Sequence, residues 1–456
     1  MIADVRARVS CEALTPGASA ASFAAGRVRP GGRRELTASG DEPRPAVVVL
    51  VGRVFPIPPE AGTPRPYQLL KRLAAHARLH LLAVVPQSSD EWQQFAANPG
   101  LRGIFSSVRV RPRRTRAAKL AQLATFLSGR PLFDVRFLDP EAVAWAHAQA
   151  HALAREQSPS VFYAWGPDSL QYLPRVFWRS CLFDLVDPPC LAVERRIAGD
   201  RELGRLERLK LRATLFGLRR FESDALFGAG VVALNSSSDI AIVRARHPGA
   251  PIVNVIDGGD AEYFSAEHVS GVAEAAAELV FFGNMSFPPN ADAAIHLASE
   301  IMPLVWRERP DAIATLIGPS PPDALRRLHD GRRIFVTGFV DDVRPYLARA
   351  TVVVSPLRFG AGMKNKLQAG LAMGKAMVAS PITCEGFDRL EPGVHACVAD
   401  GPEPIARAAL ELLADPARRR ALGAAGRELI RAHYGWDTAT GVLWANLRHL
   451  PAGTTA

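Results

Sequence analysis

Short apolar runs alternate with amphipathic stretches along most of the chain, and this alternation predicts α/β structure. The apolar run 46–52 is followed by a proline-rich loop, by a helical pattern over about 64–76 and by a second apolar run at 79–85. Strand, loop, helix and strand in this order form the unit from which parallel sheets are built. Further strands of the same sheet are expected at 161–165, 181–187, 231–235 and 251–257.

The alternation then restarts and predicts a second sheet. Its strands are expected at 278–284, 314–318, 333–338, 350–356, 376–380 and 396–400. Because open parallel sheets bind ligands at the carboxyl ends of their strands, the loops after these runs are candidate binding loops. We therefore predict two doubly wound α/β domains that face a cleft, at 46–250 and 251–430. The helical pattern from 415 to 450 predicts a tail whose end, 431–450, crosses back to the first domain.

The first 45 residues differ from the rest of the chain in pattern. They are rich in Ala, Gly, Pro, Ser and Arg, and neither a period of 2 nor one of 3.6 is present. A segment of this kind cannot bury a core, so we expect 1–45 to be disordered.

Size and cysteine content narrow the class of protein. A chain of 456 residues, of which 48% are hydrophobic, is long enough to bury two cores. The five cysteines are odd in number and widely spaced, and they form neither a Cys-x-x-Cys pair nor a Cys/His cluster, so no disulfide framework or zinc site is indicated. No apolar stretch approaches the roughly 20 residues of a spanning helix. We expect a cytoplasmic protein, either soluble or held at the inner face of the membrane.

The formal net charge of +10 points to anionic partners. Seven basic residues and no acidic one lie between Arg102 and Lys119, and the sequence AAKLAQLATFLSG that follows can form a short amphipathic helix. The segment 102–127 is therefore a candidate docking surface for anionic lipid. The competing interpretation is a solvated basic loop followed by a helix packed on the core. Nucleic acid is disfavoured because no reading module or interleaved aromatic residues accompany the charge.

A glycine-rich basic loop follows the predicted strand 350–356. It carries Arg358, Lys364 and Lys366, and the stretch between Asp342 and Glu385 contains no acidic residue. Glycines let a ligand approach the backbone, and the start of the next helix contributes partial positive charge. This combination predicts an anion site, with a basic surface turn as the competing interpretation.

Several motifs, in order and spacing, resemble those of retaining GT-B glycosyltransferases of the group 1 class, and in particular the sugar transferases of bacterial exopolysaccharide clusters. The resemblance covers roughly 46–450. It rests on segments 55–74, 184–187, 255–264, 281–293, 301–318, 336–366 and 432–436. It implies transfer of a sugar from a nucleotide diphosphate sugar, a UDP-sugar by default, to a glycan or lipid-linked acceptor. It implies no metal and no other cofactor.

The resemblance also implies roles for individual residues. Lys366 and Arg358 would neutralise the leaving diphosphate, and Asp187 would orient the acceptor unless it only caps the following loop. Glycine-rich and polar loop residues would contact the donor, although Gly62 and the stretch 338–340 can equally be plain turns. The candidate donor-binding residues are Gly62, Gly283, Asn284, Gly338, Phe339, Val340, Gly360, Gly362, Lys364, Asn365 and Glu385.

The same loop departs from the family pattern at two positions. Many relatives carry glutamates where this chain has Ala361 and Ala369, and the second of these normally binds ribose. Gln368 is one residue away and should point about 100° from that direction on a helix. Glu385 is the nearby acidic residue that could substitute. The departures leave two alternatives to an active transferase, namely a catalytically silent GT-B partner subunit and a nucleotide-sugar sensing module.

Overall fold

A computed structural model describes residues 44–55, 65–86, 91–113, 139–157, 160–201, 203–269 and 271–453. From Arg44 onward the chain forms one compact unit. Three sequence predictions fall outside the described residues: the disorder of nearly all of 1–45, the donor contact of Gly62, and the amphipathic helix within 102–127.

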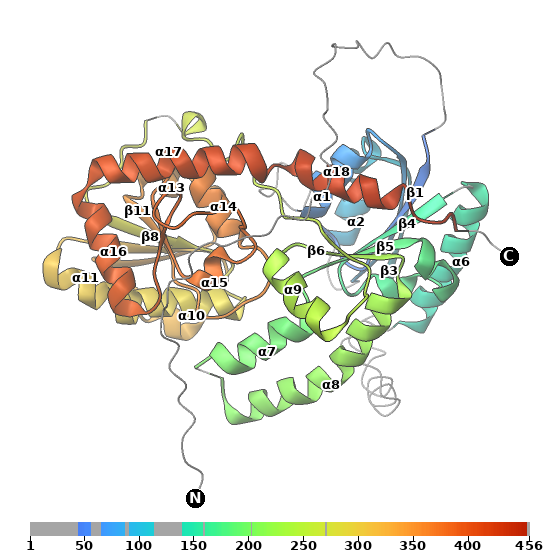
Figure 1. Cartoon of the computed structure of the whole chain (residues 1–456), viewed down its shortest axis with the longest axis horizontal. Helices are drawn as coiled ribbons and strands as arrows, with labels where there is room; N and C mark the ends of the chain where they lie inside the picture. The colour runs from blue at the N-terminus through green and yellow to red at the C-terminus, as the bar shows by residue number, and fades with distance from the viewer. Residues whose placement is uncertain are drawn as a thin grey trace, which may run out of the picture. The chain divides into compact units, whose positions relative to one another are not determined.

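Among the described residues, the first sheet has seven parallel strands in the order β3-β2-β1-β4-β5-β6-β7. They are β1 (Ala46–Val51), β2 (Arg78–Pro86), β3 (Phe105–Arg113), β4 (Ser160–Trp165), β5 (Cys181–Val186), β6 (Val231–Leu234) and β7 (Ile252–Asn254). The helices that follow these strands are α1 (Arg65–Leu73), α2 (Glu91–Ala97), α3 (Pro99–Arg102), α6 (Pro140–Glu156), α7 (Pro189–Gly199), α8 (Arg205–Gly228) and α9 (Ser237–Arg246) (Figure 1).

Alternate residues of the central strand β1 face two different cores. Val48 and Leu50 pack with residues of α6, α8 and α9. Val47 and Val49 pack on the other face, with residues of α1 and of the C-terminal helix α18 (Trp436–Leu447). Because every residue of β1 is buried, the strand reads as a continuous apolar run rather than an alternating one. Helix α18 thus belongs to the core of the first sheet.

The second sheet described has six parallel strands in the order β10-β9-β8-β11-β12-β13. They are β8 (Glu278–Phe282), β9 (Ile313–Ile317), β10 (Ile334–Gly338), β11 (Val352–Ser355), β12 (Met377–Ala379) and β13 (Cys397–Val398). Its helices are α10 (Pro288–His296), α11 (Met302–Glu308), α12 (Asp323–Arg326), α13 (Arg344–Arg349), α14 (Asn365–Ala372), α15 (Pro381–Cys384), α16 (Pro402–Ala414) and α17 (Pro416–His433) (Figure 1). The two parallel-sheet domains predicted from the sequence are confirmed.

Strand β7 pairs with β6, so the first sheet extends past residue 250, where the sequence analysis drew its boundary. The second sheet begins at Glu278. The residues between β7 and β8 form the connection that passes beside the cavity described below.

The basic stretch after residue 102 was interpreted incorrectly in part. Residues 105–113 are strand β3 and not the solvated loop of the competing interpretation, whereas the lipid contact of segment 102–127 stays a prediction. Arg109 donates to Glu156 Oε2 at 2.7 Å, and Arg111 lies 3.5 Å from Glu141. Both glutamates belong to α6, so two of the basic residues that lack acidic neighbours in the sequence have acidic partners in the fold.

Candidate functional site

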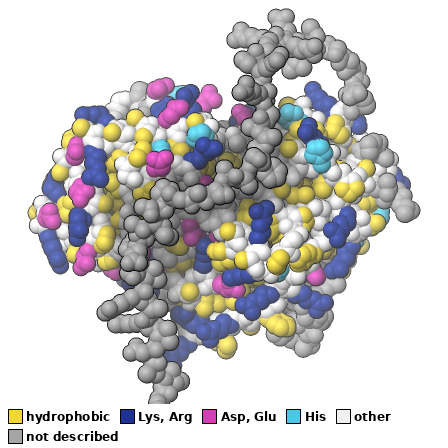
Figure 2. Space-filling model, viewed as in Figure 1, with side chains coloured by type: hydrophobic (Ala, Val, Ile, Leu, Met, Phe, Trp, Pro, Cys, Tyr) yellow, Lys and Arg dark blue, Asp and Glu magenta, His cyan; other side chains and the backbone are white. Residues whose placement is uncertain are grey.

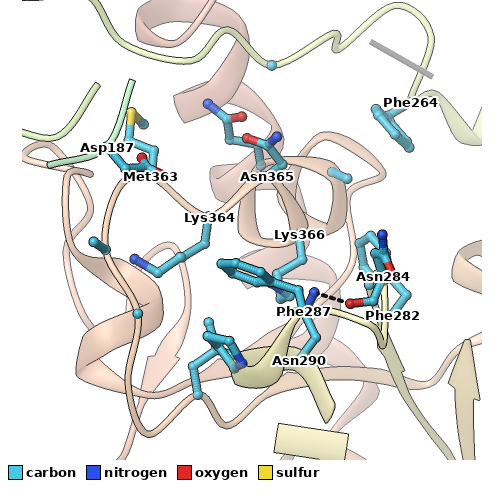
Figure 3. Close-up of a pocket in the computed structure, with 18 of the residues that line it drawn as sticks. Asp187, Phe264, Phe282, Asn284, Phe287, Asn290, Met363, Lys364, Asn365 and Lys366 are labelled. Atoms are coloured by element: carbon cyan, nitrogen blue, oxygen red, sulfur yellow. Dashed lines mark hydrogen bonds between the residues drawn. The ribbon is translucent and has the colours of Figure 1, made fainter. Parts of the chain in front are cut away.

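A cavity of about 500 Å³ lies at the carboxyl ends of strands from both sheets (Figure 3). Strand β5 leads into Asp187, β8 into Gly283 and Asn284, and β11 into the glycine-rich loop before α14. Open parallel sheets bind ligands at this edge. The lining residues are Asp187, Gly258, Gly259, Asp260, Phe264, Phe282, Gly283, Asn284, Phe287, Pro289, Asn290, Leu357, Gly360, Ala361, Met363, Lys364, Asn365, Lys366, Gln368 and Ala369.

Seven of the sequence-predicted site residues line this cavity together. Lys364 caps the start of α14, and Lys366 lies in the first turn of this helix. In Figure 3 the two lysines extend from this helix start, with Asp187 and Met363 on one side and Phe282 and Asn284 on the other. Free backbone N–H groups at a helix start favour negative charge, and the two lysines add to this effect. The seven are Asp187, Gly283, Asn284, Gly360, Lys364, Asn365 and Lys366.

Of the two lysines that line the cavity, Lys366 is the one whose charge no described residue neutralises. Among the described residues, its Nζ has no hydrogen-bond or ion-pair partner, and it lies 5.9 Å from the centre of the Phe281 ring. Burial and the nearby Lys364 lower the pKa of Lys366 to about 7. An ammonium group held in this way gains free energy when an anion enters the cavity.

Lys364 has a different environment, because acidic groups surround it. Its Nζ donates to the carbonyl oxygen of Gly362. Burial lowers the pKa of Lys364, while Glu385, Asp239 and Asp187 act to raise it. Lys364 therefore neutralises carboxylates at the boundary between the two domains, and Lys366 is the better candidate for a ligand contact.

Gly362 lies behind the cavity wall and joins the glycine-rich loop to the first domain. Its backbone N–H donates to Asp239 Oδ2 at 2.6 Å, and the neighbouring Met363 N–H donates to Asn235 Oδ1 at 3.3 Å. Gly362 has a φ of +71°, and a β-carbon there would overlap the Asp187 carboxylate. Only glycine combines this backbone conformation with so close an approach.

Asp187 lines both the main cavity and a second, neighbouring pocket, and so do Met363 and Asn365. This second pocket, of about 290 Å³, is lined by Phe55, Arg65, Pro66, Trp165, Val186, Asp187, Asn235, Asp257, Met363 and Asn365. Among the described residues, Asp187 Oδ1 and Trp165 Nε1 are buried without a hydrogen-bond partner. Burial, and next the negative charge of Asp257, raise the pKa of Asp187 to about 7. Asp187 can therefore exchange a proton near neutral pH.

A buried ion network fixes the floor of the second pocket. Arg65 binds Asp184 at 3.1 Å and Asp257 at 2.7 Å. Tyr163 donates to Asp184 at 2.7 Å, and Asn235 donates to Asp257 at 2.9 Å. Because these groups satisfy one another, the network holds Asp257, and through it the charge environment of Asp187, in place.

The structure places six predicted site residues outside the cavity lining, and Gly362, described above, is one of them. Arg358 binds Asp292 and Glu300, its Nε lying 2.8 Å from Asp292, so its charge is neutralised within the second domain. Gly338, Phe339 and Val340 also lie outside the lining residues. Glu385 binds Arg195 of α7 through both carboxylate oxygens, at 2.6 and 3.1 Å. Arg358 and Glu385 thus have ion-pair partners in this structure, and the phosphate and ribose contacts suggested for them stay predictions.

The two alanines that replace the family glutamates both line the cavity. Position 369, where many relatives carry the glutamate that binds ribose, thus borders the cavity. Gln368 also reaches the lining, but its side chain is held by the carbonyl oxygen of Asp257, to which Nε2 donates at 2.5 Å. Gln368 therefore fixes the connection 255–264 against α14 instead of substituting for a carboxylate.

Sequence reasoning missed the residues of the first domain that hold the glycine-rich loop. Asn235 and Asp239 follow strand β6, and Arg195 donates to the carbonyl oxygen of Gly360 at 2.7 Å. The sequence feature that could have revealed Asn235 and Asp239 is the polar cluster directly after strand β6, because loops at the carboxyl ends of parallel strands line binding sites. The aromatic residues Phe264, Phe282 and Phe287 of the cavity were missed as well, although they lie in motifs that carried the family resemblance.

Within the described ranges, no group of three or more His, Cys, Asp or Glu side chains is placed to hold a metal ion. None of the helices in the part of the chain that the structure describes is long and apolar enough to cross a membrane.

Residues 276–415 match the family model of the glycosyl transferases group 1. No curated protein sequence matches the chain significantly.

Solved structures resemble nearly the whole fold. A sucrose-phosphate synthase from Thermosynechococcus elongatus is 16% identical, with a TM-score of 0.59 over 89% of this chain and 99% of that one. Anabaena Alr3699/HepE in complex with UDP is 15% identical, with a TM-score of 0.56 over 89% of this chain and all (100%) of the other. A TarM mutant from S. aureus in complex with Fondaparinux, alpha-GlcNAc-glycerol and UDP is 10% identical, with a TM-score of 0.60 over 89% of this chain and 100% of the other.

The protein thus has the GT-B fold of two parallel-sheet α/β domains. The residues that match the model of the glycosyl transferases group 1, 276–415, contribute Lys366 and most of the cavity lining.

Proposed function

We propose that the protein transfers a sugar, with retention, from a nucleotide diphosphate sugar to a hydroxyl group of a glycan or lipid-linked acceptor. The observation that carries this proposal is the Lys366 ammonium, which lies in the cavity at the start of α14 without an acidic partner among the described residues. The family of residues 276–415 supports glycosyl transfer as the reaction. Retention and a place in exopolysaccharide or cell-surface glycan synthesis rest on the sequence resemblance.

In the proposed reaction, the glycosidic carbon loses its bond to the diphosphate oxygen and forms a bond to the acceptor oxygen on the same face. The acceptor hydroxyl passes its proton to the leaving diphosphate. Lys366 and the N–H groups at the start of α14 stabilise the charge that develops on the diphosphate. UDP is the default nucleotide of the proposal.

Asp187 is the proposed contact for the acceptor. It borders both the main cavity and the second pocket, and its Oδ1 lacks a hydrogen-bond partner among the described residues. Phe55 and Trp165 of the second pocket offer apolar ring surfaces next to this carboxylate. A sugar presents both C–H faces and hydroxyl groups, so this combination suits a carbohydrate acceptor.

Binding and turnover can be measured separately. The full chain is screened by thermal shift against UDP, GDP, ADP and TDP and against their common sugar conjugates, because a ligand of the folded state raises the unfolding temperature. Hydrolysis or transfer of the best-binding sugar is then measured by release of the nucleoside diphosphate. Selective binding with turnover supports a transferase.

Ala361 and Ala369 favour a second candidate, a catalytically silent partner subunit or a nucleotide-sugar sensor. Binding of a nucleotide sugar without turnover, tested with simple glycan and lipid-linked acceptors, would favour this candidate. Absence of binding to every nucleotide would reject both the transferase and the sensor.

A further inference from the structure

Helix α8 exposes large apolar side chains on one side. Leu206, Leu209 and Phe216 have relative exposures of 67%, 64% and 79%. They are three of the nine large hydrophobic residues found exposed in the described part of the chain. Side chains of this size are seldom left in water together on one helix unless the surface has a binding role.

The spacing of these residues forms a continuous stripe. At 100° per residue, Leu206, Leu209, Ala213 and Phe216 fall within about 80° of one another around the helix. The opposite side of α8 is already buried, since Leu215 and Leu218 pack with Cys190 of α7. The exposed stripe is thus separate from the side that attaches α8 to the protein.

Basic residues flank the stripe on both sides. Residues 205–220 contain six basic residues and one acidic residue, Glu207, which Arg196 binds at 2.7 Å. By the same geometry Lys210 lies on one side of the stripe, and Arg205 and Arg212 lie on the other. These three side chains are exposed, and among the described residues they have no ion-pair partner. In the space-filling view, Lys, Arg and hydrophobic side chains lie together over the region of α7 and α8 (Figure 2).

We propose that α8 docks on the surface of an anionic lipid bilayer, with the stripe inserted among the acyl chains and the flanking basic residues at the headgroups. An apolar face bordered by Lys and Arg on both sides is the pattern of helices that lie in a membrane interface. A second copy of the chain fits this surface less well, because pairing the stripe with itself would bring two sets of positive charges together. The inference does not depend on the proposed transfer reaction.

The test is sedimentation of the full-length protein with vesicles of phosphatidylcholine, pure or with about one third phosphatidylglycerol, at low and high salt. Stronger partitioning onto the anionic vesicles is expected, and salt should weaken it. The double variant Leu209→Ser/Phe216→Ser should lose at least about tenfold in partitioning. Lys210→Gln/Arg212→Gln should lose roughly fivefold per charge on anionic vesicles and little on neutral ones.

Matched controls lie on the second domain. Val394→Ser removes an apolar side chain that is 48% exposed, and Arg327→Gln removes an exposed charge, so both should leave partitioning unchanged. Because all of these positions are exposed, the unfolding temperature should be similar in every variant, and nucleotide binding serves as a second check that the fold is intact.

Three outcomes would overturn the proposal. The first is equal partitioning of the parent protein onto neutral and anionic vesicles. The second is unchanged partitioning of both α8 variants while neutral replacement of Arg114, Arg116 and Lys119 abolishes it, which would move the contact to segment 102–127. The third is a dimer of the parent protein that Leu209→Ser/Phe216→Ser dissociates, without any vesicle binding.

Discussion

The backbone N–H of Gly362 donates to the carboxylate of Asp239, which lies 123 residues earlier in the chain, at a distance of 2.6 Å. Gly362 belongs to the loop that the sequence predicts as a diphosphate cradle, whereas Asp239 belongs to α9 of the first domain. One amide of the loop is therefore used to join the two domains. The start of α14 and Lys366 remain as the groups that face the cavity.

Replacing Lys366 by Ala should reduce turnover of the donor by about a hundredfold to a thousandfold, since a group that stabilises transition-state charge contributes roughly 3 to 4 kcal/mol. The fold should survive, because Lys366 Nζ has no ion-pair partner among the described residues. Steady-state kinetics with the best-binding nucleotide sugar measures the loss, and the unfolding temperature checks the fold. Arg327→Ala is the matched control on an exposed surface. Turnover equal to that of the parent protein would show that Lys366 does not stabilise the transition state.

Nucleotide binding should take up a proton at pH values above about 7. The pKa of Lys366 in the free protein is about 7, and a bound diphosphate should raise it by direct charge attraction. The ammonium is already formed below pH 7, so affinity should be highest there and should fall as the pH rises through this value. Calorimetric titrations at pH 8 in buffers of different ionisation enthalpy measure the proton uptake. The uptake should disappear in Lys366→Met, and uptake that persists in this variant would assign the proton to another group.

Asp187→Asn should impair transfer to the acceptor and leave nucleotide affinity within about threefold of the parent, since Asp187 is the proposed acceptor contact. The pKa of Asp187 is raised to about 7, so the carboxylate is lost as the pH falls through this value. The kcat/KM of the parent should therefore decline on the acidic side of neutrality, and the Asn variant should lack this decline. If kcat/KM of Asp187→Asn still declines on the acidic side of neutrality, a different group is responsible for the decline.

Ala369→Glu should tighten nucleotide binding by up to roughly tenfold to a hundredfold. Position 369 lines the cavity, and a hydrogen bond from ribose to a charged group contributes about 1.5 to 3 kcal/mol. Titration of UDP into the parent and the variant measures the change. Ala369→Gln is the control of similar size without charge, and it should tighten binding less. Weaker binding in Ala369→Glu would mean that ribose does not lie beside this position.

Glu385→Gln should lower the free energy of unfolding by about 1 to 3 kcal/mol, because it removes one of the two charged partners of Arg195, the other being Asp239. Nucleotide affinity should change little, and the effect should be additive with Ala369→Glu, since Glu385 lies outside the cavity lining. Chemical unfolding and UDP titration of both single variants and the double variant test the two statements. Strong coupling in nucleotide affinity would restore Glu385 as a ribose contact.

The sequence by itself determined the two sheets and the position of the main loop. Buried parallel strands such as β1 and β11 are continuous apolar runs, and glycine and lysine residues before a helix predict an anion site. Strand β3 was not predicted, because its arginines, among them Arg109, resemble a solvated basic stretch in the sequence. The glutamates of α6 that bind them become neighbours only in the fold.

Only the tertiary structure decided which charges are available to a ligand. In the sequence, Lys364, Lys366 and Arg358 are all basic residues of one loop. Their positions in the sequence do not show which of them have acidic partners in the fold. Folding places carboxylates beside Arg358 and Lys364, and it leaves Lys366 in the cavity beside an aromatic ring. These carboxylates come from distant segments: Asp292 binds Arg358, and the charge of Asp239 acts on Lys364. Their positions depend on how the strands and helices pack together.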